Sequence, residues 1–338
     1  MIDIKTNILE WSNSKFAELG EPLALNLKPL RQEASFRRYF RLERKEDSII
    51  GVYSPPELES NKEFIFLSNL LRENGVNVPL VHAFDLDSGF MIVSDFGDDL
   101  LQFKINRSNA FELYQCAFKE MILINSSPIH DKFSFLTEQE VLKQMSLFEE
   151  WFLKGLLSIS MSKKEKSYLG SLYDQIVQIF FEQPQVLCHF DFETRNLLAL
   201  PGNRLGVLDF QDAVVGPLFL DPCSLLKDLH FNSTYEEVYK FLDIYLEKAI
   251  KVGLLSEQEI DRVPRWFDLT SLQRQLRILG TLSRLHLRDK KSYRIKDLEK
   301  TLNFMIETCS RNKDLNEFSV FLKKRISNEL SKRIQELL

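Results

Sequence analysis

The sequence predicts an α+β protein with two lobes, a small, mostly antiparallel β lobe followed by a larger, mainly helical lobe. Residues 23–94 carry short apolar or alternating runs separated by polar turns, a pattern typical of strands. From residue 100 onward, apolar residues recur at helical spacing over long runs. A single hydrophobic core usually stops growing below about 250–300 residues. A chain of 338 residues is therefore expected to form two lobes, of residues 1–97 and 98–338.

The first lobe is expected to begin with a helix over residues 5–19, where apolar side chains recur with helical periodicity. A second helix is predicted over residues 60–73, and Gly75 is a suitable residue to end it. Five strands, which would form one sheet, are predicted at residues 23–30, 36–42, 48–53, 79–84 and 90–94.

The second lobe is expected to be built from amphipathic helices, with a strand-like segment among them. The boundary between the lobes is predicted near residues 95–97, where a buried strand gives way to a polar turn that contains Gly97. A short helix is also expected over residues 222–229. The long helical runs are residues 107–126, 137–157, 162–182, 234–252, 268–286, 296–311 and 314–337.

Composition indicates an ordinary globular protein. Hydrophobic residues make up 44% of the chain, charged residues 28%, and the net charge of -5 provides no electrostatic basis for binding nucleic acid. The four cysteines form no C-x-x-C pair, so neither a zinc site nor a disulfide framework is expected. No export signal and no membrane span are expected, which predicts a cytoplasmic location.

The most informative segment is residues 187–209, where His189, Asp191 and Asn196 form H-x-D-x-x-x-x-N and Asp209 follows in an apolar run. This spacing is typical of phosphotransferases. The aspartate in the loop orients the acceptor hydroxyl, and later Asn and Asp residues hold metal on the nucleotide's phosphates. We therefore expect Asp191 to be the catalytic carboxylate, with His189 beside it, and Asn196 and Asp209 to bind Mg²⁺. The alternative is a buried polar loop whose carboxylates only cap turns.

A hairpin-like run is expected to bring these residues together. Its apolar segments are residues 186–188, 197–200 and 206–208, with a Pro-Gly-Asn turn at residues 201–203. This arrangement would place the polar side chains around a space of the size of one Mg²⁺ ion.

The chain resembles the aminoglycoside phosphotransferase-like kinases. Among these, it is most similar to the bacterial anomeric sugar kinases that phosphorylate N-acetylmuramate and N-acetylglucosamine in cell-wall recycling. The segment VLDFQDAVVGPLFLDPCSLLKD at residues 207–228 carries the resemblance together with ASFRRYFR at 34–41 and VPLVHAFDLDSGFMIVSDF at 78–96. The motifs QRQL, LGTLSRL and RDKKSY within residues 273–293 extend it over nearly the whole chain. The resemblance implies a bilobal, protein-kinase-like fold, ATP as the phosphoryl donor and Mg²⁺ as the cofactor.

The resemblance also implies that the segment between the lobes is a hinge that pairs with adenine. Ser94, Asp95 and Phe96 are then cofactor-binding positions. Asp95, Phe96 and Gly97 spell D-F-G, which in protein kinases is a metal motif that follows the catalytic loop. Here it precedes that loop, so we interpret Asp95 as a connector residue and assign the metal role to Asp209.

The nucleotide side of the first lobe departs from the wider kinase pattern. The third strand reads IIGVY at residues 49–53 and lacks the lysine that would pair the α- and β-phosphates. Arg37 and Arg38 are candidates for binding phosphate, and strand alternation places Arg37 and Arg41 on one face and Arg38 on the other. The turn at residues 32–35 would contact phosphates through backbone amides near Ser35. Solvated arginines are the alternative. Glu63, where the lysine's partner would lie, is expected to be solvated.

The acceptor side is expected in the second lobe, along a basic helical segment. Arg274 and Arg277 are helix neighbours, and they could hold a sugar carboxylate or hydroxyl groups. A solvated basic face explains the pattern equally well. Asp212, beside the metal loop, is another acceptor candidate, or a turn cap. The acceptor candidates are Asp212, Arg274, Arg277, Arg284 and Arg288.

The expected function is therefore that of an ATP- and Mg²⁺-dependent kinase acting on the anomeric hydroxyl of an N-acetylated amino sugar. A phosphotransferase for choline, an amino acid or an aminoglycoside is an alternative, which would call for acidic or aromatic residues around a cationic acceptor. A nucleotide-binding scaffold without activity is a further alternative, suggested by the missing lysine.

Overall fold

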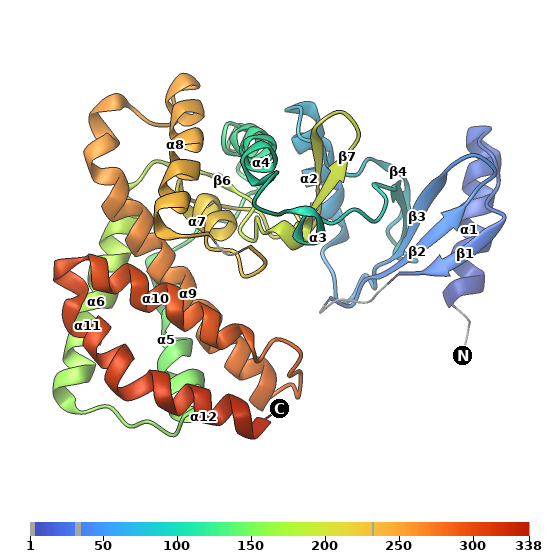
Figure 1. The fold of residues 1–338 in the computed structure, drawn as a ribbon. Helices are drawn as coiled ribbons and strands as arrows, with labels where there is room; N and C mark the ends of the chain where they lie inside the picture. Colours follow the sequence, from blue (N-terminus) through green and yellow to red (C-terminus); the bar gives the residue numbers. More distant parts are fainter. Residues whose placement is uncertain (1–3, 31–34, 232, 338) are drawn as a thin grey trace. The chain divides into compact units, whose positions relative to one another are not determined.

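The structure is a computed structural model, and it describes residues 4–30, 35–231 and 233–337. The chain divides into two compact units (Figure 1). One unit consists of Met1–Ile105 with Thr194–Asp212, and the other of Asn106–Glu193 with Ala213–Leu338. We describe each unit by itself.

The first unit is built on a five-stranded sheet in the order β1-β2-β3-β5-β4, in which every neighbouring pair is antiparallel. This confirms the predicted antiparallel lobe. β3 and β5 have the predicted bounds, whereas β1 begins later than expected because Leu23 and Leu25 are exposed. The strands are β1 (Asn26–Pro29), β2 (Arg38–Glu43), β3 (Ser48–Tyr53), β4 (Val81–Asp85) and β5 (Phe90–Ser94).

Two helices accompany this sheet. α1 (Ile4–Leu19) packs on it through Ile8 and Phe16, which join apolar side chains of the strands in two core clusters (Figure 1). Gly51 on β3 allows this close approach, since a Cβ there would lie 3.2 Å from Cδ1 of Ile8. α2 (Asn61–Glu73) ends before Gly75, which has a φ of +84° and so adopts a conformation that glycine favours. The short α3 (Leu101–Lys104) follows β5.

A β-hairpin from later in the chain completes the first unit. The short helix η2 (Thr194–Asn196) leads into β7 (Leu197–Leu200), which pairs with β8 (Arg204–Val207). The N–H of Ala199 donates to the carbonyl of Asp99 (2.8 Å), and the N–H of Val207 donates to the carbonyl of Asn77 (2.8 Å). These bonds explain why the hairpin groups with the β unit. The predicted boundary between the lobes, near residue 97, stays a prediction.

The predicted single hairpin-like run was wrong in one respect. β6 (Gln185–Cys188) does not pair with the hairpin but with β9 (Val214–Pro217) in a separate two-stranded sheet of the second unit. β9 was not expected as a strand, because four apolar residues after Asp209 and Asp212 carry no periodic signal of their own. The chain thus leaves the second unit after β6 and re-enters it at β9.

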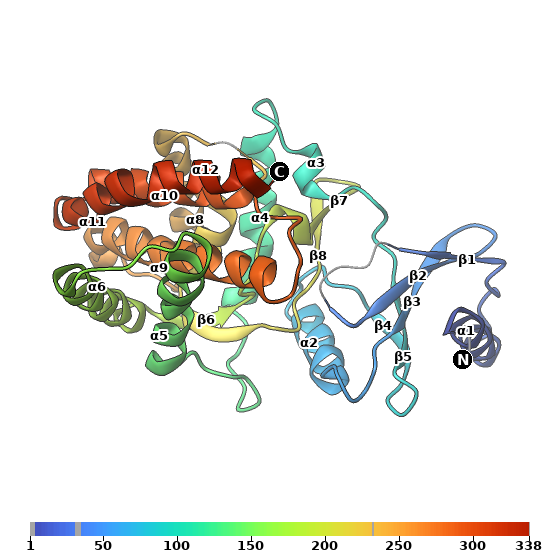
Figure 2. The same ribbon diagram turned by 90° about the horizontal axis from the view of Figure 1, so that it is seen from below.

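The second unit is mainly helical, as predicted, and α9 (Val263–Leu287) runs through its interior. α9 begins earlier than the expected residue 268, since Pro264 occupies a first-turn position and Trp266 and Phe267 are buried. Figure 2 shows α10 and α12 side by side. The other elements are α4 (Ala110–Asn125), α5 (Glu138–Leu147), η1 (Phe148–Leu156), α6 (Lys163–Glu182), α7 (Leu220–Leu226), α8 (Tyr235–Lys251), η3 (Glu257–Arg262), α10 (Asp297–Arg311), η4 (Lys313–Leu315), α11 (Asn316–Phe321), η5 (Leu322–Ile326) and α12 (Ser327–Leu337).

In the part of the chain that the structure describes, no helix combines the length and the apolar character needed to cross a membrane. Among the described residues, Cys116, Cys188, Cys223 and Cys309 form no disulfide bond.

Candidate active site

The loop that follows β6 is held by a buried carboxylate from α7. The N–H of His189 donates to Oδ2 of Asp221 (2.7 Å), and the N–H of Phe190 donates to Oδ1 (3.0 Å). Asp221 has no exposed surface. Burial raises its pKa to about 6, although His189 and the two backbone hydrogen bonds lower it. Asp221 therefore fixes the backbone immediately before Asp191.

Asp191 lies against an arginine of α9. Nη2 of Arg277 donates to Oδ1 of Asp191 at 3.2 Å, and the guanidinium lies over the ring of Phe190, 4.2 Å from its centroid. Phe190 has a φ of +80°, an uncommon conformation for a bulky residue. Burial lowers the pKa of Arg277, and the charge of Asp191 opposes that shift. The side chain of Asp191 is 34% exposed, so it is accessible to a ligand.

A second arginine of α9 supports the same loop from the interior. Arg274 forms a buried ion pair with Glu193, and its Nε donates to the hydroxyl of Ser224 at 2.8 Å. Arg274 and Arg277 therefore project together, as their helix spacing predicted, and both reach the loop after β6. Arg274 is only 2% exposed, so its side chain is enclosed by the protein.

His189 is almost completely buried, and its ring meets that of Phe192 edge to face, with centroids 5.6 Å apart. This position fits a residue that shapes the loop.

Asn196 and Asp209 flank the two ends of the β7–β8 hairpin, Asn196 just before β7 and Asp209 two residues after β8. The N–H of Leu208 donates to the carbonyl of Asn196 at 2.8 Å, which joins the start of β7 to the residue before Asp209. Asp209 is exposed and has a φ of +60°, while Phe210 next to it is buried and stacks on Phe64. Nε2 of Gln211 donates to Oδ1 of Asp209 at 2.7 Å. Carboxylate and amide oxygens are suitable ligands for Mg²⁺, so this pair fits the predicted metal role.

The connector after β5 is fixed by a bidentate arginine. Nε and Nη2 of Arg41 bind the two carboxylate oxygens of Asp95 (2.6 and 3.1 Å), and its Nη1 binds Asp98 (2.6 Å). The hydroxyl of Ser48 and the N–H of Gly97 also donate to Asp95. Burial opposes ionisation of Asp95, yet these hydrogen bonds keep its pKa below the usual value. The geometry is that of a connector residue.

The other two connector positions are also held in place. The hydroxyl of Ser94 accepts from the N–H of Leu80 at 3.3 Å. The ring of Phe96 lies against Gly206 of β8, where a Cβ would come within 2.4 Å of Cδ2 of Phe96.

The residues predicted to face phosphate differ in their surroundings. Arg37 is buried: its Nη2 pairs with Glu59 at 3.1 Å, and its Nε donates to Ser54 at 3.2 Å. Ser35 donates to the same Glu59 (2.7 Å), whereas Arg38 is exposed. The rest of the turn predicted at residues 32–35 lies outside the described residues. Glu63 is exposed, as expected.

Burial raises the pKa of Tyr39 on β2 to about 12; the charge of Arg37 lowers this pKa, and the charge of Asp209 raises it.

The remaining acceptor candidates are not gathered at the loop. Arg288 follows the end of α9, is more than half exposed and pairs with its neighbour Asp289 at 2.6 Å. Nε of Arg284 is buried and has no hydrogen-bond acceptor among the described residues. Asp212 is exposed.

Three carboxylates that position the candidate residues were not predicted from the sequence: Asp221, Glu193 and Glu59. Each meets its partner across a long stretch of chain, 32, 81 and 22 residues apart, as the numbering of His189, Arg274 and Arg37 shows. In the sequence, Asp221 is distinguished only by its place just before the helix predicted at residues 222–229. No local pattern identifies such pairings.

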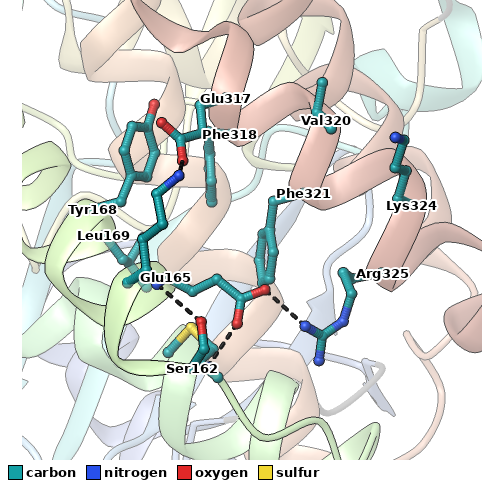
Figure 3. Close-up of a pocket in the computed structure, with 12 residues that line it drawn as sticks. Ser162, Glu165, Tyr168, Leu169, Glu317, Phe318, Val320, Phe321, Lys324 and Arg325 are labelled. Carbon is teal, nitrogen blue, oxygen red and sulfur yellow. Dashed lines mark hydrogen bonds and ion pairs between the residues drawn. The ribbon is translucent and has the colours of Figure 1, made fainter.

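A separate cavity of about 370 Å³ in the second unit lies between α6 and the α11–η5 segment (Figure 3). It contains none of the predicted site residues. Two ion pairs line it, Arg325 with Glu165 at 2.7 Å and Lys164 with Glu317 at 3.2 Å, together with Lys324. We place the candidate catalytic residues on the loop of the second unit and the candidate metal ligands on the hairpin of the first unit, because the chemistry-bearing side chains lie there rather than in this cavity.

Residues 138–252 match the phosphotransferase enzyme family. The chain is 30% identical over 318 residues to the N-acetylmuramate/N-acetylglucosamine kinase of Pseudomonas aeruginosa, with 92% of this chain and 94% of that relative covered. It is also 30% identical over 298 residues to the kinase of the same name from Pseudomonas putida, with 88% of each covered.

Among solved structures, the ADP-bound aminoglycoside phosphotransferase APH(2'')-Ib has a TM-score of 0.58 and 18% identity, with 91% of this chain and 99% of that chain covered. This likeness shows the fold, which is protein-kinase-like. The sequence identity to the Pseudomonas kinases, over nearly the full length of both chains, shows the family. The chain therefore belongs to the same family as these kinases, and it is a phosphotransferase enzyme.

Proposed function

We propose that this protein is an ATP- and Mg²⁺-dependent kinase that phosphorylates an N-acetylated amino sugar, N-acetylmuramate or N-acetylglucosamine, at its anomeric hydroxyl. The observation that carries the proposal is the 30% identity over 92% of the chain to a relative named for both sugars. The loop motif supplies the residues that such a reaction needs. A cytoplasmic location and a role in cell-wall recycling follow as parts of the same proposal.

Asp191 is proposed to accept or orient the proton of the acceptor hydroxyl. Its carboxylate is partly exposed, on a loop whose backbone Asp221 fixes. A hemiacetal hydroxyl is more acidic than an ordinary alcohol, so an aspartate of ordinary basicity suffices. His189, buried in the same loop, is proposed to hold its conformation.

Asn196 and Asp209 are proposed to hold Mg²⁺ through their side-chain oxygens. When bound, Mg²⁺ neutralises charge on the nucleotide's phosphates. The hydrogen bond between Leu208 and Asn196 keeps the two positions of the hairpin in register, and Gln211 orients the Asp209 carboxylate.

On the nucleotide side, the backbone of residues 94–97 is proposed to pair with adenine. Arg37 is proposed to replace the lysine that β3 lacks. In protein kinases that lysine is oriented by a glutamate of a nearby helix. Arg37 has a comparable partner in Glu59, just before α2. It also lies beside Tyr39, whose pKa is raised by burial and also by the charge of Asp209.

The proposal is tested by a turnover assay with ATP and Mg²⁺ on N-acetylmuramate, N-acetylglucosamine, glucose, choline and an aminoglycoside, with phosphorus NMR to locate the phosphate. We expect turnover on the two acetylated sugars and an anomeric phosphate as the product. Turnover on a cationic acceptor alone would contradict the proposed substrate. Tight ATP binding without turnover on any acceptor would favour the scaffold alternative.

The role of Asp191 is tested by Asp191→Asn, which is expected to lower kcat by roughly 10²–10⁴-fold, the usual contribution of acid–base catalysis. Asp174→Asn, an exposed position on α6 of the same unit, is the matched control and should keep full turnover. A folded Asp191→Asn protein with wild-type turnover would contradict the mechanism.

A further inference from the structure

Arg277 has an unusual position among the arginines near the candidate loop. Its side chain is only 14% exposed, it contacts the proposed catalytic carboxylate at 3.2 Å, and it covers the ring of Phe190. A cation in such a position is largely removed from water, and an anion that reaches it binds more strongly than it would at a solvated site.

Most of the hydrogen-bonding capacity of Arg277 remains unused. A guanidinium has five N–H donors. Within the residues that the structure describes, Arg277 makes a single hydrogen bond, from Nη2 to Asp191. Arg274, one turn earlier on α9, instead uses both Nε and Nη2 on Ser224 and Glu193. Arg277 thus has unused N–H groups that can donate to a second anionic partner.

The two candidate acceptors differ in charge. N-acetylmuramate is N-acetylglucosamine with a lactyl ether, whose carboxylate lies across one pyranose ring from the anomeric carbon. If the anomeric hydroxyl contacts Asp191, a guanidinium that touches Asp191 is within reach of that carboxylate. A planar guanidinium also matches carboxylate geometry, with two parallel hydrogen bonds.

We infer that Arg277 is a specificity-determining residue that favours an acceptor carrying a carboxylate over a neutral one. This inference rests on the proposed function and deepens it. A carboxylate on the acceptor takes the unused N–H groups of Arg277 and draws its charge away from Asp191, which makes Asp191 a better proton acceptor. A neutral acceptor leaves the guanidinium on Asp191 and is phosphorylated less efficiently.

The first test uses the wild-type protein and a matched pair of substrates, N-acetylmuramate and its lactyl amide, which share a carbon skeleton but differ in the charge of the lactyl group. The kcat/KM for the acid should exceed that for the amide by at least about tenfold, a difference that one charge-assisted pair can supply. Equal values for the two substrates would overturn the inference, whereas a wild-type protein inactive on both sugars would overturn the proposed function and the inference with it.

The second test is Arg277→Gln, checked for folding by its thermal unfolding. The ratio of kcat/KM between N-acetylmuramate and N-acetylglucosamine should fall at least tenfold, and Arg277→Lys should retain part of the preference because it keeps the charge. Arg265→Gln, an exposed position on the same helix, should leave the ratio unchanged. If Arg277→Gln lowers activity on both sugars equally, Arg277 acts only by positioning Asp191, and the inference fails.

Discussion

His189 and Asp221 are joined by a hydrogen bond of 2.7 Å, in which the main-chain N–H of His189 donates to Oδ2 of the buried carboxylate. The other carboxylate oxygen accepts from Phe190, so one side chain from α7 satisfies two successive backbone donors. A buried N–H without an acceptor is costly, and these two bonds therefore stabilise a loop whose Phe190 has an uncommon backbone conformation.

Replacing Asp221 with alanine should destabilise the protein and slow the reaction. Two backbone donors would lose their acceptor, at a cost of about 2–6 kcal/mol, since each unsatisfied group costs roughly 1–3 kcal/mol. We expect lower kcat with little change in the KM for ATP. Denaturant unfolding and steady-state kinetics measure both effects. Asp174→Ala, at an exposed position, should change stability by less than about 0.5 kcal/mol. An Asp221→Ala protein with unchanged kcat would show that the loop holds its shape without this anchor.

Asp268 should make the stability of the protein depend on pH. Burial raises its pKa to about 6, while Lys227 and the hydroxyl of Tyr239 lower it. The folded state therefore holds this proton more tightly than the unfolded chain. The resulting stability is present below about pH 4 and is lost as pH rises through 6, with a slope of at most about 1.4 kcal/mol per pH unit.

Asp268→Asn removes this titration and should flatten the fall of the unfolding free energy between pH 4 and 6. The amide can still accept from Tyr239, whose hydroxyl lies 3.2 Å from Oδ1. Denaturant unfolding at several pH values measures the slope, and Asp174→Asn should keep the wild-type slope. Identical slopes in wild type and Asp268→Asn would show that Asp268 titrates at its ordinary pH.

Gly206→Ala should disturb the contact between β8 and Phe96. A Cβ at this position would lie 2.4 Å from Cδ2 of Phe96, so the ring must move. Overpacking of this kind costs about 1–3 kcal/mol. Because Phe96 belongs to the proposed adenine-binding connector, the Kd for ATP, measured by calorimetry, should rise.

Gly170→Ala is the control for this prediction, because a Cβ there meets no atom within 4 Å and the residue lies inside α6. This variant should be more stable than the wild type by roughly 0.5–1 kcal/mol, since alanine favours a helix over glycine. If the Gly206→Ala protein is destabilised but its Kd for ATP is unchanged, the packing of Phe96 against β8 does not contribute to nucleotide binding.

Arg37→Met should raise the KM for ATP by about tenfold or more and leave the KM for the sugar nearly unchanged, if Arg37 replaces the missing lysine. Lys62→Met, at an exposed position of α2, should leave both values unchanged. Because Arg37 is buried against Glu59 and Ser54, thermal unfolding of the variant must accompany the kinetics. A destabilised protein with normal KM for ATP would assign Arg37 a structural role alone.

The elements with strong local patterns could be predicted from the sequence. β3 and β5 have the expected bounds because their apolar runs are bordered by turn residues, and α2 and α6 differ from expectation by one residue at the start. β9 was missed because it becomes a strand only by pairing with β6, 26 residues away at Cys188 and Val214 as the numbering shows. Tertiary pairing, which local propensity does not contain, decides such short strands.

The candidate site also has a part that the sequence predicts and a part that it does not. The spacing of Asp191, Asn196 and Asp209 could be recognised as a motif because the three residues lie in one short stretch of chain. The residues that position them could not be recognised. Arg277 was a candidate for binding the acceptor, but its contact with Asp191 joins positions 86 residues apart in the sequence, which no local pattern indicates. Likewise, no periodicity distinguishes the buried Arg274 from the exposed Arg288, although both lie on one basic segment.

Arg41 forms ion pairs with two carboxylates of the connector at once, those of Asp95 and Asp98. A change at Arg41 alone would leave the buried carboxylate of Asp95 without its main counter-charge, and a change at Asp95 alone would leave Arg41 without its bidentate partner. The two positions should therefore have changed together during the divergence of related chains. Where a relative carries another residue at the position of Arg41, we expect an uncharged residue at the position of Asp95, so the pair should be visible as correlated substitution.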